Sequence, residues 1–220
     1  MQRITEPELM ADPAQAKAYA EANFETAHQS FIDLFQKHFP HLDIQHEVLD
    51  LGCGPADVTR RFAKAFPDAI LHAVDGAAAM LEQAARLNQQ HHLAERIELI
   101  ESRLPKPTLP QTHYHTLISN SLLHHLHDPH VLWDTVQAHA SPFANVFVMD
   151  LMRPASPDQA RALVQQYARD EAETLRNDFY HSLCAAFIPT EVQQQLDEHG
   201  LSQLVVEPVS DRHMIIYGTL

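Results

Sequence analysis

Residues 48–55 read VLDLGCGP, a short apolar run that ends abruptly in two glycines and a proline. The run from Val48 to Leu51 is typical of a buried strand, here carrying one acidic residue, Asp50. Apolar residues then recur with helical spacing over 56–66. Glycine permits positive φ and lets the backbone approach a ligand closely. The stretch therefore predicts a strand, a glycine turn and a helix whose first N–H groups can receive a polar or anionic ligand group.

The spacing of the glycines distinguishes between two kinds of ligand. A dinucleotide site needs the pattern G-x-G-x-x-G, but Asp57 stands here in place of the third glycine. The pattern Asp50-x-Gly52-x-Gly54 instead resembles the first motif of the class I S-adenosylmethionine-dependent methyltransferases. That family often has a third glycine where Ala56 stands, and we expect alanine to leave the turn intact. The resemblance implies S-adenosylmethionine as cofactor, bound at this turn by Asp50, Gly52, Cys53 and Gly54.

Length and composition indicate one globular domain. The chain has 220 residues, of which 45% are hydrophobic, enough for a sizeable core. No apolar run approaches the ~20 residues of a membrane span, and the polar N-terminus does not resemble a signal peptide. The two cysteines, Cys53 and Cys184, are far apart in sequence, so we expect a reduced, cytoplasmic protein.

The net charge of −14 argues against nucleic acid as a partner. Nucleic-acid phosphates are bound by clusters of Lys and Arg, and this chain has only 15 such residues. No membrane partner is expected either, and the oligomeric state does not follow from the sequence.

A second buried strand is predicted over 69–75, ending in Asp75. This acid follows Gly54 by about the twenty residues expected of a carboxylate that binds ribose hydroxyls. The alternative is that Asp75 caps the next helix, which begins near Ala77. The following residues also resemble the second motif of the family. This resemblance adds Gly76 and Met80 to the cofactor contacts, with Met80 against the adenine unless it only packs in the core.

The third strand, 96–100, is followed by a departure from the family pattern. The family often has Gly-Asp here, whereas this chain has Ser102-Arg103. An arginine cannot accept a hydrogen bond from the adenine amino group. We therefore expect adenine recognition through Ser102, a backbone carbonyl or stacking on Arg103, with Leu104 beside them.

The fourth strand, 115–120, leads into SLLHHLHDP over 121–129, which closely resembles the family motif after this strand. Asn120 and Ser121 are expected at the carboxyl edge of the sheet, where α/β folds bind ligands, and are counted with the cofactor contacts. His124 and His125 are candidates for orienting or deprotonating a substrate. The histidines of 124–130 also suggest a metal, but no second cluster of carboxylates or cysteines completes a site, so no metal centre is expected.

Candidate acceptor residues come from three places in the chain. The fifth strand, 144–150, ends in Asp150, which is expected to face the substrate. Residues 177–183 mix titratable and aromatic side chains, a composition common in binding sites. The candidates for substrate binding are Tyr19, Arg153, Asp178, Tyr180 and His181. The candidates for a general base are Asp150, His124, His125, His181 and Asp178.

The resemblance implies a three-layer α/β/α sandwich with a seven-stranded, mostly parallel sheet whose last strand is antiparallel. We expect one domain over 1–220. Its parts are an N-terminal helical lid, 1–40; a cofactor-binding core, 41–154; a helical insertion that extends the lid, 155–188; and the last helix and closing strands, 189–220.

The implied activity is methyl transfer to an O, N, S or C atom of a small molecule. A lid over the carboxyl edge suits a small acceptor because it can exclude water; a protein acceptor is the lesser option. Two alternatives remain at this stage: an enzyme that binds S-adenosylmethionine but transfers another group, and a catalytically silent partner subunit.

Overall fold

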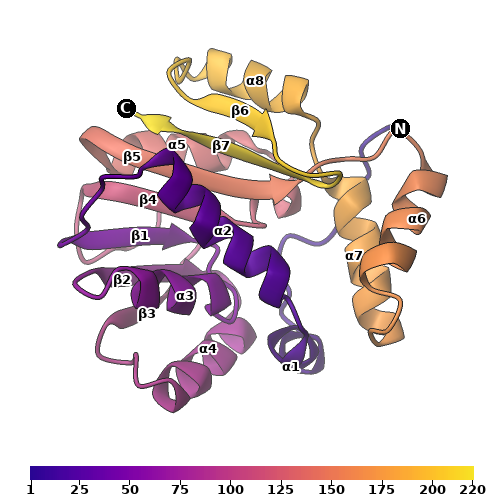
Figure 1. The fold of residues 1–220 in the computed structure, drawn as a ribbon, viewed down its shortest axis with the longest axis horizontal. Helices are drawn as coiled ribbons and strands as arrows, with labels where there is room; N and C mark the ends of the chain where they lie inside the picture. Colours follow the sequence, from indigo (N-terminus) through magenta and orange to yellow (C-terminus); the bar gives the residue numbers. More distant parts are fainter.

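A computed structural model describes residues 1–220, and its centre is a seven-stranded sheet in the order β3-β2-β1-β4-β5-β7-β6 (Figure 1). β7 runs antiparallel to both neighbours, and the other pairings are parallel. This is the expected class I topology. The strands are β1 (Glu47–Leu51), β2 (Ile70–Asp75), β3 (Ile97–Glu101), β4 (Tyr114–Asn120), β5 (Ala140–Leu151), β6 (Val205–Pro208) and β7 (His213–Thr219).

Helices cover both faces of the sheet and extend beyond its carboxyl edge, where the arrows of β1 and β5 point towards α6 and α7 (Figure 1). None of them is long and apolar enough to span a bilayer. They are α1 (Pro13–Glu21), α2 (Glu25–His38), α3 (Asp57–Ala65), α4 (Ala78–Gln90), α5 (His130–His139), α6 (Pro157–Tyr167), α7 (Glu173–Ala185) and α8 (Pro189–Glu198), with a short 3₁₀ turn, η1 (Leu123–His125).

The helix α2 is part of the core rather than a lid. Its apolar residues recur at positions 31, 34, 35 and 39, which places them on one helical face. Phe31 and Phe35 are fully buried, and their rings lie 4.9 and 5.5 Å from the ring of Phe147 on β5, edge to face. Most of α2 therefore belongs to the core rather than to the lid expected over 1–40, and only its first turn, residues 26–28, lines a cavity.

The opposite face of the sheet is covered by α5 and α8. Trp133 of α5 is completely buried and donates its indole N–H to Gln195 of α8 at 3.0 Å. Val192 and Leu196 pack into the same cluster as the apolar side chains of β1, β4 and β5. The sheet and the helices on its two faces form the three layers of the expected α/β/α sandwich.

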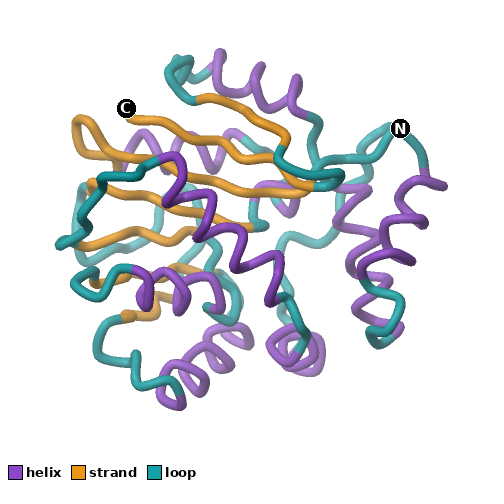
Figure 2. The backbone as a smooth tube through the Cα atoms, in the orientation of Figure 1, coloured by secondary structure: helices purple, strands orange, loops and turns teal.

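Residues 1–12 form an extended strap that precedes α1 and contains no helix (Figure 2). Arg3 anchors it, donating hydrogen bonds to the carbonyl oxygens of Ala185, His124 and Leu126 at 2.6, 3.0 and 2.8 Å. The Arg3 guanidinium also lies 3.9 Å from the centre of the Phe187 ring. The strap therefore connects the insertion to the turn after β4 and, with α1, provides the cover expected from the N-terminal region.

We predict that Phe35→Ala lowers the free energy of unfolding by about 3–5 kcal/mol, because it removes a fully buried ring from the α2–sheet contact. The matched control is Phe143→Ala, whose ring is 81% exposed and whose loss should change stability by no more than about 0.5 kcal/mol. Urea denaturation of the three proteins measures both. Equal stability of the two variants would contradict the packing of α2 as core.

Candidate active site

The glycine turn between β1 and α3 has the backbone geometry that the sequence predicts. Gly52 and Gly54 have φ of 73° and 54°, and the N–H of Gly52 donates to the carbonyl of Val74 at 2.8 Å. A Cβ on Gly52 would lie 2.8 Å from the side chain of Leu122, so this position needs glycine. Ala56 takes φ of 60°, a left-handed conformation that costs an L-residue ~1–2 kcal/mol. This explains why a glycine would suit position 56, while the turn stays intact with alanine.

Asp75, at the end of β2, ties the glycine turn to the next helix. Its two carboxylate oxygens each accept a backbone N–H at 2.8 Å, one from Gly54 and the other from Ala77. Burial raises the pKa of this carboxyl, and these hydrogen bonds oppose the rise. The capping alternative is thus observed, and Asp75 also lines a cavity at this edge of the sheet.

Asp50, on β1, is a buried carboxylate whose one side-chain partner is a neutral group. The hydroxyl of Thr59 donates to it at 2.6 Å. Burial raises its pKa to about 7, and the nearby Asp75 carboxylate adds to this effect. A cationic ligand group beside Asp50 would supply the missing countercharge.

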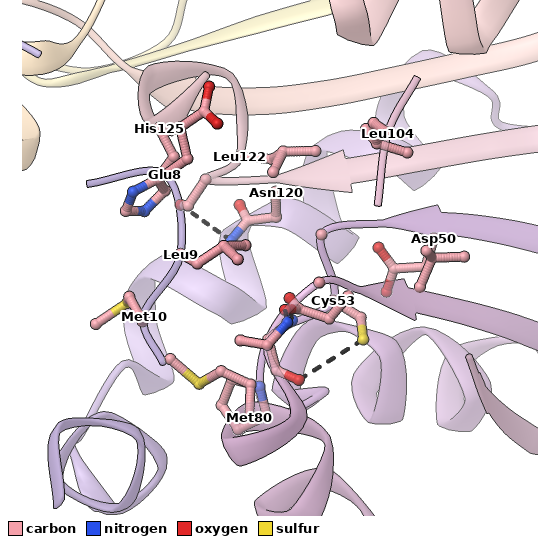
Figure 3. Close-up of a pocket in the computed structure, with 18 of the residues that line it drawn as sticks. Glu8, Leu9, Met10, Asp50, Cys53, Met80, Leu104, Asn120, Leu122 and His125 are labelled. Atoms are coloured by element: carbon pink, nitrogen blue, oxygen red, sulfur yellow. Dashed lines mark hydrogen bonds between the residues drawn. The ribbon is translucent and has the colours of Figure 1, made fainter. Parts of the chain in front are cut away.

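A cavity of about 190 Å³ opens at the carboxyl ends of β1, β2 and β4 (Figure 3). Three residues of the strap, Glu8, Leu9 and Met10, form part of its wall. All twelve positions expected to contact a cofactor line this cavity: Asp50, Gly52, Cys53, Gly54, Asp75, Gly76, Met80, Ser102, Arg103, Leu104, Asn120 and Ser121.

A second, larger cavity of about 990 Å³ adjoins the first, and we call it the chamber. The strap, α1, α2, α7 and the ends of β4 and β5 enclose it. Four of the five residues expected to bind substrate line it: Tyr19, Asp178, Tyr180 and His181.

Arg153 is the exception among the expected substrate residues. Its guanidinium is bonded to Glu191 at 2.6 Å and to the carbonyl of Ala186 at 3.1 Å, and it lies outside both cavities. The expectation for Arg153 is corrected, because its charge is used to attach the start of α8 to the end of β5.

The two cavities meet at the end of β4. Asn120, Ser121 and His125 line both of them, and so does Tyr19 of α1. Ser121 has φ of 56°, and its hydroxyl accepts from the Asn120 amide at 3.2 Å. Backbone strain of this kind is often found at functional sites. A group transferred between two ligands would pass at this junction.

Asp150 does not face the chamber as expected. It is 1% exposed, and its carboxylate accepts the backbone N–H groups of Leu123 and Leu151 at 2.8 and 2.7 Å. The ring Nδ1 of His124 lies 2.6 Å from the same carboxylate. The assignment of Asp150 as a catalytic base is therefore corrected: its three hydrogen bonds hold η1 and orient His124. Of the other candidates, His124, His125 and His181 line the chamber.

Five acidic or basic residues in the chamber wall were not predicted from the sequence: Glu6, His28, Glu171, Arg212 and His213. Glu6 of the strap lies 3.6 Å from His124 Nε2 and 3.3 Å from His125 Nδ1. His28 of α2 lies 2.7 Å from Asp57 and lines both cavities. The strap has no periodicity to reveal its position, and His28 has no motif around it.

The sequence of this chain is similar to those of known methyltransferases. Residues 48–142 match the family model described as "Methyltransferase domain". A trans-aconitate 2-methyltransferase of Pseudomonas paraeruginosa is 36% identical over 104 residues, a match that covers 40% of this chain and 38% of that protein. An uncharacterised methyltransferase of Mycobacterium bovis is 24% identical over 171 residues, covering 78% of this chain and 82% of that protein. The chain thus spans well under half the length of the trans-aconitate relative.

Solved structures are similar over almost the whole chain. A SAM-dependent methyltransferase of Aquifex aeolicus has a TM-score of 0.71 at 17% identity, covering 94% of this chain and 98% of that one. The plantazolicin methyltransferase in complex with SAH has a TM-score of 0.68 at 15% identity, covering 94% and 91%. Together, these matches show that residues 48–142 are similar to methyltransferase domains and that the chain as a whole has the class I methyltransferase fold.

Proposed function

We propose that the protein is an S-adenosylmethionine-dependent methyltransferase that acts on a small molecule. The observation that carries this proposal is the pair of adjoining cavities at the carboxyl edge of the sheet. The smaller is lined by every position that the family motifs assign to the cofactor. The larger, with a volume of about 990 Å³, has room for an acceptor, and it meets the first at Asn120, Ser121 and His125.

The residues of the first cavity fit the parts of this cofactor. The Asp75 carboxylate suits a ribose diol, and the poorly compensated Asp50 carboxylate suits the ammonium of the amino acid moiety. Backbone N–H groups of the glycine turn suit its carboxylate. Met80 and Leu104 offer apolar surface to the adenine. The part played by Ser102 and Arg103 in adenine recognition stays a prediction.

The chemistry asks little of the protein beyond placement. When bound, the cofactor would supply a methyl group on a positive sulfonium; an acceptor atom in line with the carbon–sulfur bond bonds to the methyl carbon, and the sulfur leaves as a neutral thioether. The chain's contribution is to align the acceptor at the junction and to exclude water from it, and ideal alignment is worth up to ~7–11 kcal/mol. The strap and α1 contribute to this exclusion because they form part of the walls of both cavities. His181 and Asp178 lie in the chamber wall, where they can take a proton from the acceptor.

The chamber walls indicate the kind of acceptor. About half of the lining residues are aromatic or aliphatic, including Phe24, Leu175 and Phe179, and the polar ones include five histidines and three carboxylates. The one Lys or Arg in the wall is Arg212, which is already 3.1 Å from Asp211. A tricarboxylate such as the trans-aconitate of the relative would find little countercharge here. We infer an acceptor that is largely apolar and carries at most one negative charge.

We predict that S-adenosylhomocysteine raises the melting temperature, because it binds the folded state alone. At a hundredfold excess over Kd the rise should be roughly 5–10 °C. NAD should cause no rise, since the glycine turn lacks the dinucleotide spacing. A shift with NAD and none with S-adenosylhomocysteine would overturn the proposal.

We further predict that Asp75→Asn weakens S-adenosylhomocysteine binding roughly ten- to hundredfold, because a charge-assisted hydrogen bond worth about 1.5–3 kcal/mol is lost. Asp68→Asn, at an exposed position before β2, is the matched control and should bind like the wild type. Calorimetric titration measures the three dissociation constants. An unchanged constant for Asp75→Asn would leave Asp75 only its capping role.

Asp50 should make the stability of the ligand-free protein fall as pH rises. Its native pKa of about 7 lies above the ~3.9 of an unfolded aspartate, so the native state holds a proton that the unfolded state releases. Stability from this source is present at pH 4 and is lost progressively up to pH 7. Asp50→Asn should therefore flatten the dependence of melting temperature on pH between 4.5 and 7.5, whereas exposed Asp43→Asn should not. Parallel curves for all three proteins would refute the assignment.

For the acceptor side, we predict that Asp178→Asn and His181→Asn lower turnover at least tenfold with labelled cofactor and an acceptor found by screening apolar hydroxyl, amine and thiol compounds. Their affinity for S-adenosylhomocysteine should stay at the wild-type value. Asp170→Asn, at an exposed position between α6 and α7, is the control and should leave turnover unchanged. Full activity of both chamber variants, or methylation of tRNA at low salt, would contradict the assignment of the chamber.

A further inference from the structure

We propose that Glu6, His124 and His125 bind a divalent transition-metal ion in the chamber wall. These residues come from the strap and from η1, more than a hundred positions apart in the sequence. One ligand atom from each lies within 4.8 Å of the other two. No metal centre is expected from the sequence, because no second cluster of carboxylates or cysteines completes a site; in the fold, Glu6 brings a carboxylate to the two histidines.

The distances between the donor atoms suit a single shared ion. Glu6 Oε1 lies 3.3 Å from His125 Nδ1 and 3.6 Å from His124 Nε2. Bonds of about 2.0–2.1 Å in tetrahedral geometry, as for Zn²⁺, place two donors about 3.3–3.4 Å apart. Small side-chain shifts would therefore bring all three donors to bonding distance.

One of the donors has no other use in the structure. His125 Nδ1 is buried and makes no hydrogen bond, although Glu6 Oε1 lies close to it. An unpaired buried ring nitrogen is costly, and an ion would satisfy it.

The surrounding residues orient the ligands as in many metal sites. His124 turns Nε2 towards Glu6 while Nδ1 lies 2.6 Å from the buried carboxylate of Asp150. The hydroxyl of Ser182 on α7 donates to Glu6 at 3.0 Å. Carboxylate–histidine pairs of this kind fix the ring and increase its basicity towards a metal.

Three protein ligands leave further coordination positions, and all three residues line the chamber. Two imidazoles and one carboxylate suit Zn²⁺, Co²⁺ or Fe²⁺, and an open position is typical of catalytic rather than structural sites. The ion would act as a Lewis acid that lowers the pKa of an acceptor hydroxyl. This role rests on the proposed function, whereas the binding itself does not.

In that role the reaction balances without another reagent. The acceptor hydroxyl releases its proton to solvent. Its oxygen forms the bond to the methyl group, while the electron pair of the broken carbon–sulfur bond stays on sulfur and neutralises the sulfonium. The substrate class is thus an acceptor with a hydroxyl or carboxylate oxygen. His124 and His125 would then hold the ion, and His181 and Asp178 remain the groups able to take a proton directly.

The test uses the tag-free full chain after treatment with a chelator. Titration with Zn²⁺ against a chromophoric chelator should show one equivalent bound more tightly than the rest, and Co²⁺ should give a visible absorption band of tetrahedral intensity. Glu6→Gln should lose that equivalent and the band, although it retains all 17 histidines. Glu8→Gln is the matched control, since Glu8 lies on the same strap and bonds the backbone of His127 instead. It should bind like the wild type.

The contrary outcomes are specific. No tight equivalent in the wild type, or equal binding by wild type and Glu6→Gln, would overturn the site and leave the cluster a hydrogen-bonded network. His125→Asn provides a second variant and should weaken Zn²⁺ binding at least tenfold. The rise in melting temperature with S-adenosylhomocysteine, measured on every variant, shows that it is folded. The same rise tests the proposed function separately, because it needs no metal.

Discussion

The arrangement of the site depends on the hydrogen bonds that the buried carboxylate of Asp150 accepts. This carboxylate lies at the end of β5 and binds the backbone of η1 and the ring of His124, so it fixes the turn that follows the neighbouring strand β4. His124 faces Glu6 of the strap in turn. A charge at 1% exposure is costly unless its hydrogen bonds are made, and here they are. The end of the sheet, the turn and the cover of both cavities are thereby connected through one group.

Much of the fold and of the cofactor cavity could be predicted from the sequence, because both depend on local patterns. Alternation of apolar strands with helices of period 3.6 leads to a doubly wound sheet, and parallel strands place their carboxyl ends at one edge. Asp75 and Asn120 end such strands and Asp50 is the second-last residue of its strand, so all three lie at the same edge of the sheet. The glycine turn needed only Gly52 and Gly54 in the right spacing.

The remainder depended on contacts that no local pattern encodes. The strap has neither helical nor strand periodicity, so the position of Glu6 follows only from the tertiary bonds of Arg3 and Ser182. Arg153 follows β5 at the carboxyl edge of the sheet, where a substrate was expected, but its guanidinium is paired with Glu191 on α8. An ionisable residue can be recognised from sequence as able to bind, whereas what it binds is decided by which element packs beside it.

The strap lines both the first cavity and the chamber, so one segment of the chain covers the two. Glu8, Leu9 and Met10 line the cofactor cavity, while residues 4–7 line the chamber. A Cβ on Gly76 would lie 2.9 Å from the Leu9 side chain, so the cofactor turn and the strap are in close contact. Displacing the strap would expose both cavities to water together. The strap is held by polar contacts of Arg3, Glu6 and Glu8 and by the packing of Leu9 and Met10, so it covers both cavities without filling the chamber.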